Sequence, residues 1–434
     1  MGCFGGALRV LLINQAFYPD TVATAQHTTD LAQFLASRGH AVSVLCSRRA
    51  YSQPDKIFSR TEDFDGIHIV RARGTGFGKG SFLFRVVDIF TLQVAFLFRL
   101  LTFSKQDVVI AFTSPPLVSF LAWLYCRLRG ARLVSWLMDI NPDAAIAVGY
   151  LSPMGLVSRI LLRILKFTLA KSDSVVVLDR WMKERVIAKG VAAAKVVVVP
   201  PWDIQDPAAF DQPNIRGPLN PFRRENGLEG KFVVLYSGNL SIVHPLDTLL
   251  KAAVRLKDDA STEFLFIGGG LRTSDVDHTR EKYRLKNLLQ LPYQPRTRLP
   301  FSLSCADVHV IVLGEKVSGL VHTSKVYGTL MAGVPFIVVA PKESHLGDLV
   351  GVVPGGFQVE HGDVDGFLRS LASIRELSDD DRAVIRLEQR RYLLKNFALQ
   401  ELLTTFEEAA ITRPLPSPDS DSIPGFQSSH QRSR

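Results

Sequence analysis

The chain has 434 residues, of which 47% are hydrophobic and 21% charged, so it is long enough for two or three domains with sizeable cores. Its formal net charge of +9 predicts anionic partners, such as a phosphorylated substrate, nucleic acid or an acidic membrane surface. The four cysteines lie far apart without a CxxC pair, which argues against a disulfide framework or a metal cluster and favours a reducing, cytosolic compartment.

Residues 1–200 are predicted to form an α/β domain. Short runs such as "LRVLLIN", "AVSVLC", "DVVIAF" and "SVVVLD" alternate with longer helical patterns. The runs are continuous in Val, Ile and Leu, as is typical of parallel strands that are covered on both faces. We therefore expect βαβ units in this part of the chain.

Two apolar segments of this first domain carry basic residues. The longest, residues 81–105, is interrupted by two arginines, an aspartate and a glutamine, so we do not expect it to span a membrane. Residues 153–171 set four basic side chains among leucines. Such helices suit an anionic membrane surface, although a helix that covers the sheet and extends its charges into solvent explains them equally well. Nucleic acid is not expected, because aromatic residues do not interleave with the charges.

The remaining chain repeats the α/β pattern. The proline-rich residues 201–222 predict an interdomain linker, and residues 223–378 a second Rossmann-like domain. Residues 379–410 have a helical pattern and could cross back to the first domain, whereas residues 412–434 predict a disordered tail. The predicted fold class is thus α/β, with two doubly wound domains facing a cleft, where ligands bind beyond the carboxyl ends of the strands.

Three loops of the second domain are candidates for holding a ligand. Glycine lets the backbone approach a ligand closely, and it also permits tight turns, so both explanations stay open for the first two loops. The third loop leads into the apolar helical run "KVYGTLMAG", and Thr323 or Ser324 is a candidate N-cap. The candidate residues of the three loops are Ser237, Gly238 and Asn239; Gly268, Gly269 and Gly270; and Thr323, Ser324 and Lys325.

Lys325 stands at the predicted start of a helix, where the macrodipole is already positive. A cation at this position is unfavourable unless an anion lies opposite it. A helix N-terminus with a lysine suits a phosphate or diphosphate, although a solvated lysine is the simpler alternative. Lys325 is therefore a candidate catalytic and ligand-binding residue.

In the first domain, "WLMDINPDA" places Asp139 at the end of a predicted strand and Asp143 four residues later. A carboxylate at a cleft edge can orient a sugar hydroxyl or accept a proton, so Asp139 is the second candidate catalytic residue. Asp143 is better explained as an ordinary helix start. No group of histidines has metal-ligand spacing, and we expect neither a metal nor another cofactor.

Six fragments together resemble family 4 glycosyltransferases, and specifically those of bacterial colanic acid, capsule and O-antigen synthesis. The resemblance extends over about residues 8–408 and depends on the order and spacing of the fragments. They are "FYPDTVATAQHTTDLAQFLASRGHAVSVL", "TSPP", "WLMDINPD", "YSGNLSIVHPLDTLLKA", "FIGGG" and "TSKVYGTLMAGVP".

The resemblance implies a retaining enzyme of the GT-B fold. It implies that the second domain binds a nucleotide sugar without a metal, with its diphosphate at Gly238 and Lys325. It also implies that the first domain holds a polyprenyl-linked or glycan acceptor, at the inner face of the plasma membrane. The expected protein is therefore cytoplasmic and peripherally associated with an anionic membrane surface.

The chain departs from the family pattern at three places. Many members have a Gly-Gly pair where this chain has "TVATAQ", and many have Arg and Lys after the "GN" turn, where this chain has only His244. The family's two glutamates would fall near Leu320 and at Gly328, and neither position is acidic. Two alternatives therefore stay open beside the hexosyl or N-acetylhexosaminyl transferase: a nucleotide-sugar 2-epimerase of the same architecture, and a non-catalytic nucleotide-sugar-binding partner.

Overall fold

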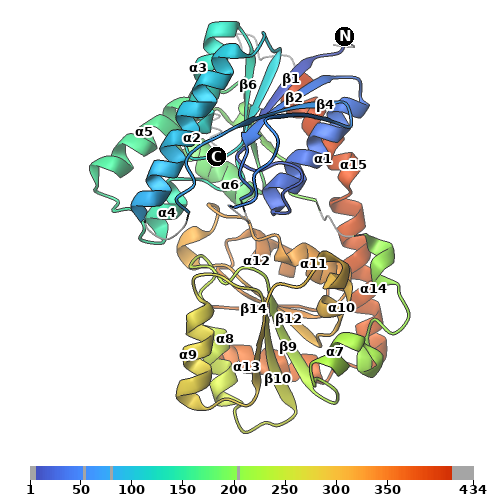
Figure 1. Cartoon of the computed structure of the whole chain (residues 1–434). Coiled ribbons are helices and arrows are strands. Elements are labelled where there is room, and N and C mark those ends of the chain that lie inside the picture. Colours follow the sequence, from blue (N-terminus) through green and yellow to red (C-terminus); the bar gives the residue numbers. More distant parts are fainter. Residues whose placement is uncertain (1–5, 52–54, 79–81, 203–205, 413–434) are drawn as a thin grey trace, which may run out of the picture.

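The computed structural model describes residues 6–51, 55–78, 82–202 and 206–412 (Figure 1). Two α/β domains lie one above the other, each built around its own mainly parallel sheet. The prediction of two doubly wound domains is confirmed. The predicted tail, 412–434, lies outside the described residues except for Thr412.

Within the described residues, the first sheet has eight strands in the order β3-β4-β2-β1-β5-β6-β7-β8. Its strands are β1 (Arg9–Ile13), β2 (Ala41–Ser47), β3 (Thr61–Phe64), β4 (Ile67–Ala72), β5 (Val108–Ala111), β6 (Arg132–Trp136), β7 (Ser174–Val177) and β8 (Val196–Val198). Its helices are α1 (Ala23–Ser37), α2 (Phe82–Thr102), α3 (Val118–Arg129), α4 (Asp143–Ala147), α5 (Leu156–Lys171) and α6 (Arg180–Ala188). One face packs against α2 and α3, and the other face packs against α1 and the end of the chain.

An antiparallel edge strand, β3, is the one departure from the expected parallel sheet in the described chain. β3 and β4 form a hairpin whose turn is Asp65-Gly66, both with positive φ. An Asp-Gly pair is a strong hairpin signal because this turn needs positive φ. The sequence thus contained a signal for this hairpin that strand-helix alternation did not reveal.

The second sheet has six parallel strands in the order β11-β10-β9-β12-β13-β14. They are β9 (Phe232–Ser237), β10 (Thr262–Ile267), β11 (Leu288–Leu291), β12 (Val308–Val312), β13 (Phe336–Val339) and β14 (Gly356–Val359). The helices are α7 (Pro221–Glu225), α8 (Asp247–Arg255), α9 (Thr273–Tyr283), α10 (Leu299–Ser304), α11 (Lys325–Ala332), α12 (His345–Val350) and α13 (Val364–Arg375). Every residue of β10 and β12 is buried, which explains why both strands are mainly apolar.

The segment predicted as a linker, 201–222, contributes apolar side chains to the cores of both domains. Trp202 lies in the core of the first domain, whereas Phe210, Ile215 and Phe222 lie in the core of the second. Trp202 therefore still belongs to the first domain, and Phe210 already belongs to the second. Proline content alone did not show that apolar residues between the prolines are buried.

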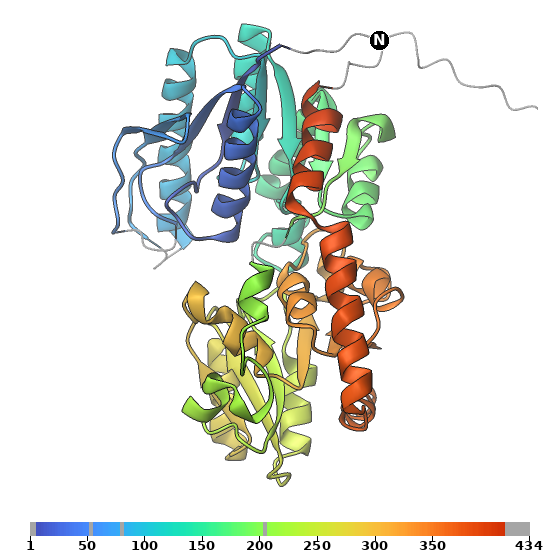
Figure 2. The same ribbon diagram turned by 90° about the vertical axis from the view of Figure 1, so that its right-hand side faces the viewer.

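The chain crosses back near its end through two helices. α14 (Asp379–Asn396) lies on the second domain and α15 (Leu399–Phe406) on the first, one above the other in Figure 2. Phe406 packs 4.7 Å from the ring of Trp136, and Arg132 donates a hydrogen bond of 2.6 Å to the carbonyl oxygen of Ile411. The two domains are thus joined by two chain crossings on the same side. Within the described residues, no helix is long and apolar enough to cross a membrane.

Candidate functional site

The candidate site lies where the carboxyl ends of both sheets meet. In the second sheet, β9 and β12 are neighbours although the chain leaves them in opposite directions, which makes the crevice between their loops the expected ligand site. The loop after β12 reaches the first domain, where Asp139 and Val321 form a β-bridge. The amide of Ile140 also donates a hydrogen bond of 2.8 Å to the carbonyl oxygen of Leu320.

Lys325 is the first residue of α11 and lies over Gly238. A Cβ at Gly238 would come within 2.6 Å of the lysine Cε, so a larger residue there would force the Lys325 side chain to shift. The ammonium nitrogen lies 5.5 Å from the ring centre of Tyr236. Among the described residues, no carboxylate pairs with Lys325, and burial lowers its pKa to about 7. Lys325 thus lies at the positive end of a helix, as the sequence predicted, and the anion expected opposite it stays a prediction.

The two residues before Lys325 do not cap the helix through their side chains. Ser324 occupies the N-cap position and is exposed, and no side-chain bond caps the first turn. The first N–H groups of a helix have no partner inside it, so these amides remain available to an anion. Thr323 is buried, and its hydroxyl has no hydrogen-bond partner in the described structure.

The two glycine loops pack against each other. The amide of Gly238 donates to the carbonyl oxygen of Ile267, at 2.8 Å, and that of Leu240 donates to Gly269, at 3.0 Å. A Cβ at Gly268 would lie 2.1 Å from the carbonyl oxygen of Gly238, and one at Gly270 would lie 2.4 Å from the side-chain oxygen of Asn239. Loop packing thus explains Gly268 and Gly270, and their contact with a ligand stays a prediction. Ser237 ends β9 beside this loop.

Asp139 comes three residues after β6 ends, at the domain interface. Burial raises the pKa of its carboxyl group to about 6, and the nearby charge of His322 opposes this rise. Asp139 has no ion pair with another described residue. Asp143, by contrast, begins α4 and pairs with Lys189 at 2.5 Å, which agrees with a structural role.

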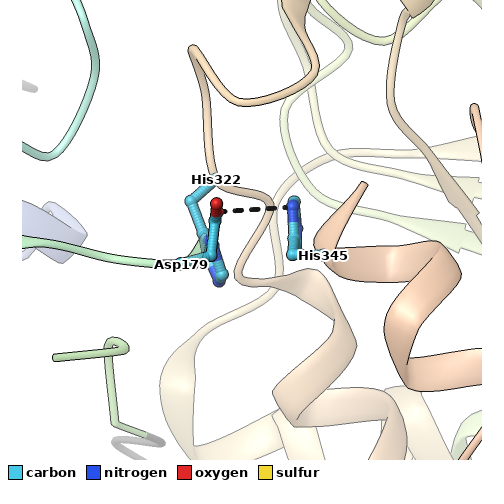
Figure 3. Close-up of side chains that lie close together, drawn as sticks. All are labelled: Asp179, His322 and His345. Atoms are coloured by element: carbon cyan, nitrogen blue, oxygen red, sulfur yellow. Dashed lines mark hydrogen bonds and ion pairs between the residues drawn. The ribbon is translucent and has the colours of Figure 1, made fainter. Parts of the chain in front are cut away.

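A cluster of Asp179, His322 and His345 joins the two domains (Figure 3). Asp179 follows β7 in the first domain, and its Oδ2 atom lies 2.8 Å from Nδ1 of His322 and 3.6 Å from Nδ1 of His345. The three side chains are 8%, 4% and 7% exposed. Burial tends to raise the pKa of Asp179, but the hydrogen bond from His322 and the two imidazoles hold it below its usual value.

These three residues are close enough to hold a metal ion, but their hydrogen bonds oppose one. The amide of Thr323 donates to Nε2 of His345 at 3.1 Å, so Nδ1 of that ring carries the proton. Binding a metal through Nδ1 would move the proton to Nε2. The N–H at Nε2 would then face the N–H of Thr323, and two donors cannot form a hydrogen bond. The rings of His322 and His345 are also stacked 3.9 Å apart, which does not aim both at one ion. Metal independence itself stays a prediction.

Sequence reasoning missed all three residues of this cluster. Asp179 follows "SVVVL" directly, His322 precedes Lys325 by three residues, and His345 starts α12. All three therefore lie in segments that follow the carboxyl ends of strands. Ligand sites form at this edge of a sheet, and this was the signal that the sequence offered.

His244, in the loop after β9, is buried near Lys325 with no partner for Nδ1 in the described structure. Burial, and then the charge of Lys325, lower its pKa.

A cavity of about 650 Å³ lies between the domains, beside the two chain crossings. Its walls come from the loop after β1, from α1, from Arg296 and from the break between α14 and α15. Arg296 donates a hydrogen bond of 3.0 Å to Gln26, which also lines the cavity. The volume is that of a ligand pocket, but neither Lys325 nor Asp139 lines it.

Comparisons with known proteins agree with this architecture. A family model described as a glycosyl transferase 4-like domain matches residues 23–202. The putative colanic acid biosynthesis glycosyl transferase WcaI of Escherichia coli (strain K12) is 25% identical over 366 residues, which cover 80% of this chain and 87% of that protein. The probable glycosyltransferase WbjE of Pseudomonas aeruginosa is 26% identical, over 74% of this chain and 78% of its own.

Solved structures share the fold. HepE of Anabaena, in complex with UDP and glucose, superposes with a TM-score of 0.67 at 14% identity, covering 92% of this chain and 98% of its own. WaaG, a glycosyltransferase involved in lipopolysaccharide biosynthesis, superposes with a TM-score of 0.64 at 14% identity, covering 93% and 99%. The chain is therefore a glycosyltransferase of the GT-B fold that carries a glycosyl transferase 4-like domain.

Proposed function

We propose that this glycosyltransferase is a retaining enzyme that moves a hexosyl or N-acetylhexosaminyl group from a nucleotide sugar to a polyprenyl-linked or glycan acceptor. The setting is bacterial cell-surface polysaccharide synthesis, as the names of WcaI and WaaG suggest. The observation that carries the donor assignment is the half-buried Lys325, which has no carboxylate partner among the described residues, at the uncapped start of α11. The UDP bound to HepE supports a nucleoside diphosphate as the anion.

In the proposed reaction, the bond between the sugar C1 and the diphosphate oxygen breaks, and a bond from C1 to the acceptor oxygen forms on the same face. Negative charge accumulates on the leaving diphosphate, where Lys325 and the amides at the start of α11 stabilise it. The acceptor proton passes to a phosphate oxygen of the leaving group. Asp139, on the opposite domain, orients a sugar hydroxyl. Because Lys325 and the helix amides supply the positive charge, we propose that no divalent metal takes part.

The donor would be identified by thermal unfolding with a panel of UDP-, GDP- and dTDP-sugars. A ligand at 100 times its dissociation constant stabilises the folded protein by about 2.7 kcal/mol. The stabilising sugar nucleotide is then incubated with and without a polyprenyl-linked acceptor. Release of the nucleoside diphosphate only with the acceptor supports transfer. A change in the sugar without any acceptor would instead indicate the epimerase, and binding without turnover on any acceptor of the panel would indicate the non-catalytic partner.

We also propose that the first domain rests on the anionic inner face of the plasma membrane. α3 packs against both α2 and α5, and Figure 1 places the three helices on one side of this domain. Apolar side chains stand exposed on α2 and around the start of α5. They include Phe90, Val94, Phe98 and Leu101 on α2, and Met154, Leu156, Val157 and Ile160 near α5.

The exposed apolar groups are accompanied by basic ones. Arg159 and Arg163 are exposed on α5 between its apolar positions. Apolar side chains that enter the headgroup region, flanked by cations that meet anionic lipids, are typical of a protein that lies on a membrane without crossing it. This position would bring the cleft to the bilayer surface, where a polyprenyl-linked acceptor is held.

A further inference from the structure

We infer that Asp179 and His322 are positioning residues, which tie the loop before α11 to the first domain and so set Lys325 opposite Asp139. This inference rests on the proposed transfer reaction. It concerns a contact between the domains rather than a contact with substrate.

The loop from Leu320 to Thr323 is held from both domains. On the first-domain side, Leu320 accepts the amide hydrogen of Ile140 and His322 bonds to Asp179, each at 2.8 Å. These partners follow β6 and β7, so two neighbouring strand ends of the first sheet hold one loop of the second domain. The close approach also requires Gly319, where a Cβ would lie 2.9 Å from the carbonyl oxygen of Trp181.

The same loop residues set the start of α11. Nε2 of His322 lies 2.9 Å from the hydroxyl of Tyr327, in the first turn of that helix. The Thr323 amide bonds to His345, which begins α12 and stacks on His322. Lys325 lies between these two anchored positions. Any movement of His322 relative to Asp179 is therefore transmitted to the residues on both sides of Lys325.

The contact joins the two candidate catalytic residues. Asp139 forms its β-bridge with Val321, the residue directly before His322, and the charge of His322 acts on its carboxyl group. Separation of the domains would break the Asp179–His322 bond. The same movement would take Asp139 away from the start of α11. Because all three side chains of the cluster are buried, removal of one partner leaves a polar group unpaired in the interface.

Three variants test the contact between Asp179 and His322. Asp179 also caps α6 by accepting the Met182 amide hydrogen at 2.8 Å, and Asp179→Asn keeps an oxygen for this cap while removing the charge. His322→Ala removes the bond. His322→Asn replaces the Nδ1–H donor with an amide N–H at the same branch of the side chain, so it is the conservative rescue.

Asp348→Asn is the matched control. Asp348 pairs across the same interface with Arg180 at 2.6 Å, a pair that is 60% and 35% exposed. Asp348 also accepts a hydrogen bond of 3.0 Å from Nε1 of Trp181, for which asparagine keeps an oxygen, and within the described residues none of its side-chain hydrogen bonds goes to the loop before α11. Exposed pairs contribute little to stability, so this variant should behave as wild type. Comparison with this control variant distinguishes a general weakening of the domain interface from the loss of the Asp179–His322 contact.

The first measurement is hydrogen exchange of the amides in residues 318–328 of the free, full-length protein. We expect exchange at least about tenfold faster in Asp179→Asn and His322→Ala than in wild type, with α8 of the same domain unchanged. His322→Asn and the Asp348 control should stay near wild type. Wild-type exchange in both Asp179→Asn and His322→Ala would overturn the inference, as would equal acceleration throughout the second domain.

The second measurement is steady-state transfer with the sugar nucleotide that wild type uses. Asp179→Asn and His322→Ala should lower kcat by about tenfold or more while donor KM changes less than about threefold, because positioning acts on the transition state. A role limited to stability would leave kcat of the folded enzyme unchanged, and that result would overturn the inference. Absence of transfer by wild type would refute the proposed function instead, and the exchange result would still stand.

Discussion

Replacement of Lys325 by Met tests the proposed diphosphate site most directly. Methionine keeps an apolar side chain over Gly238 and Tyr236 but removes the charge. The difference between the ordinary lysine pKa of 10.5 and the value of about 7 corresponds to about 4–5 kcal/mol, at about 1.4 kcal/mol for each pH unit. Water reaches this partly exposed residue and relieves part of the penalty. We therefore expect the free Met variant to be about 2 kcal/mol more stable than wild type at pH 7.

The pH dependence of the free energy of unfolding tests the charge of Lys325 independently. Between pH 7 and 10.5 the unfolded chain binds a proton on Lys325 that the folded protein does not hold. The Lys325 contribution to stability therefore rises with pH across this window, and the advantage of the Met variant should shrink toward zero. Urea unfolding of both proteins at pH 7, 8.5 and 10 measures the difference, in which the other titrating groups cancel.

Donor binding should change in the opposite direction. A charge-assisted hydrogen bond contributes about 1.5–3 kcal/mol, so the Met variant should bind UDP, GDP or dTDP about ten- to hundredfold more weakly by calorimetry. Turnover should fall at least as much, because charge on the diphosphate grows as the bond breaks. Lys325→Arg should restore binding only in part, since its planar group differs from a point charge. Unchanged affinity and turnover in the Met variant would refute the assignment of the diphosphate to Lys325.

Three further predictions follow from the site and its surroundings. Gly238→Ala should weaken nucleoside diphosphate binding by displacing Lys325, whereas Gly39→Ala, also at positive φ but with nothing within 4 Å, should affect only stability. EDTA should leave transfer unchanged, and a loss that magnesium or manganese restores would contradict metal-free catalysis. The double variant Phe90→Ser and Phe98→Ser should bind anionic vesicles more weakly, because these side chains are 66% and 64% exposed. The control Leu387→Ser changes a side chain that is 58% exposed on the second domain, and it should leave vesicle binding unchanged. High salt should release the wild-type protein from those vesicles, because it screens charges beyond about 8–10 Å, and release only by detergent would contradict the surface position.

The sequence by itself determined the two α/β domains and the nature of the lysine loop. Runs of β-branched residues predict buried parallel strands because this pattern depends only on neighbours along the chain. The same is true of Lys325, whose conflict with the helix dipole is a local property of residues 323–332. The family resemblance added the GT-B arrangement, which the solved relatives bear out. Asp139 was likewise visible as an acid after a strand.

Only the tertiary structure decided which of these groups meet. Asp179 and His322 are separated by 143 residues, and their bond exists because the two domains face each other across the cleft. The packing of Gly268 against Gly238 and the burial of Phe210 within a proline-rich segment also depend on contacts between distant residues. Local sequence patterns carry no information about such contacts, because burial and hydrogen bonding between distant residues are fixed only when the sheets and domains pack together.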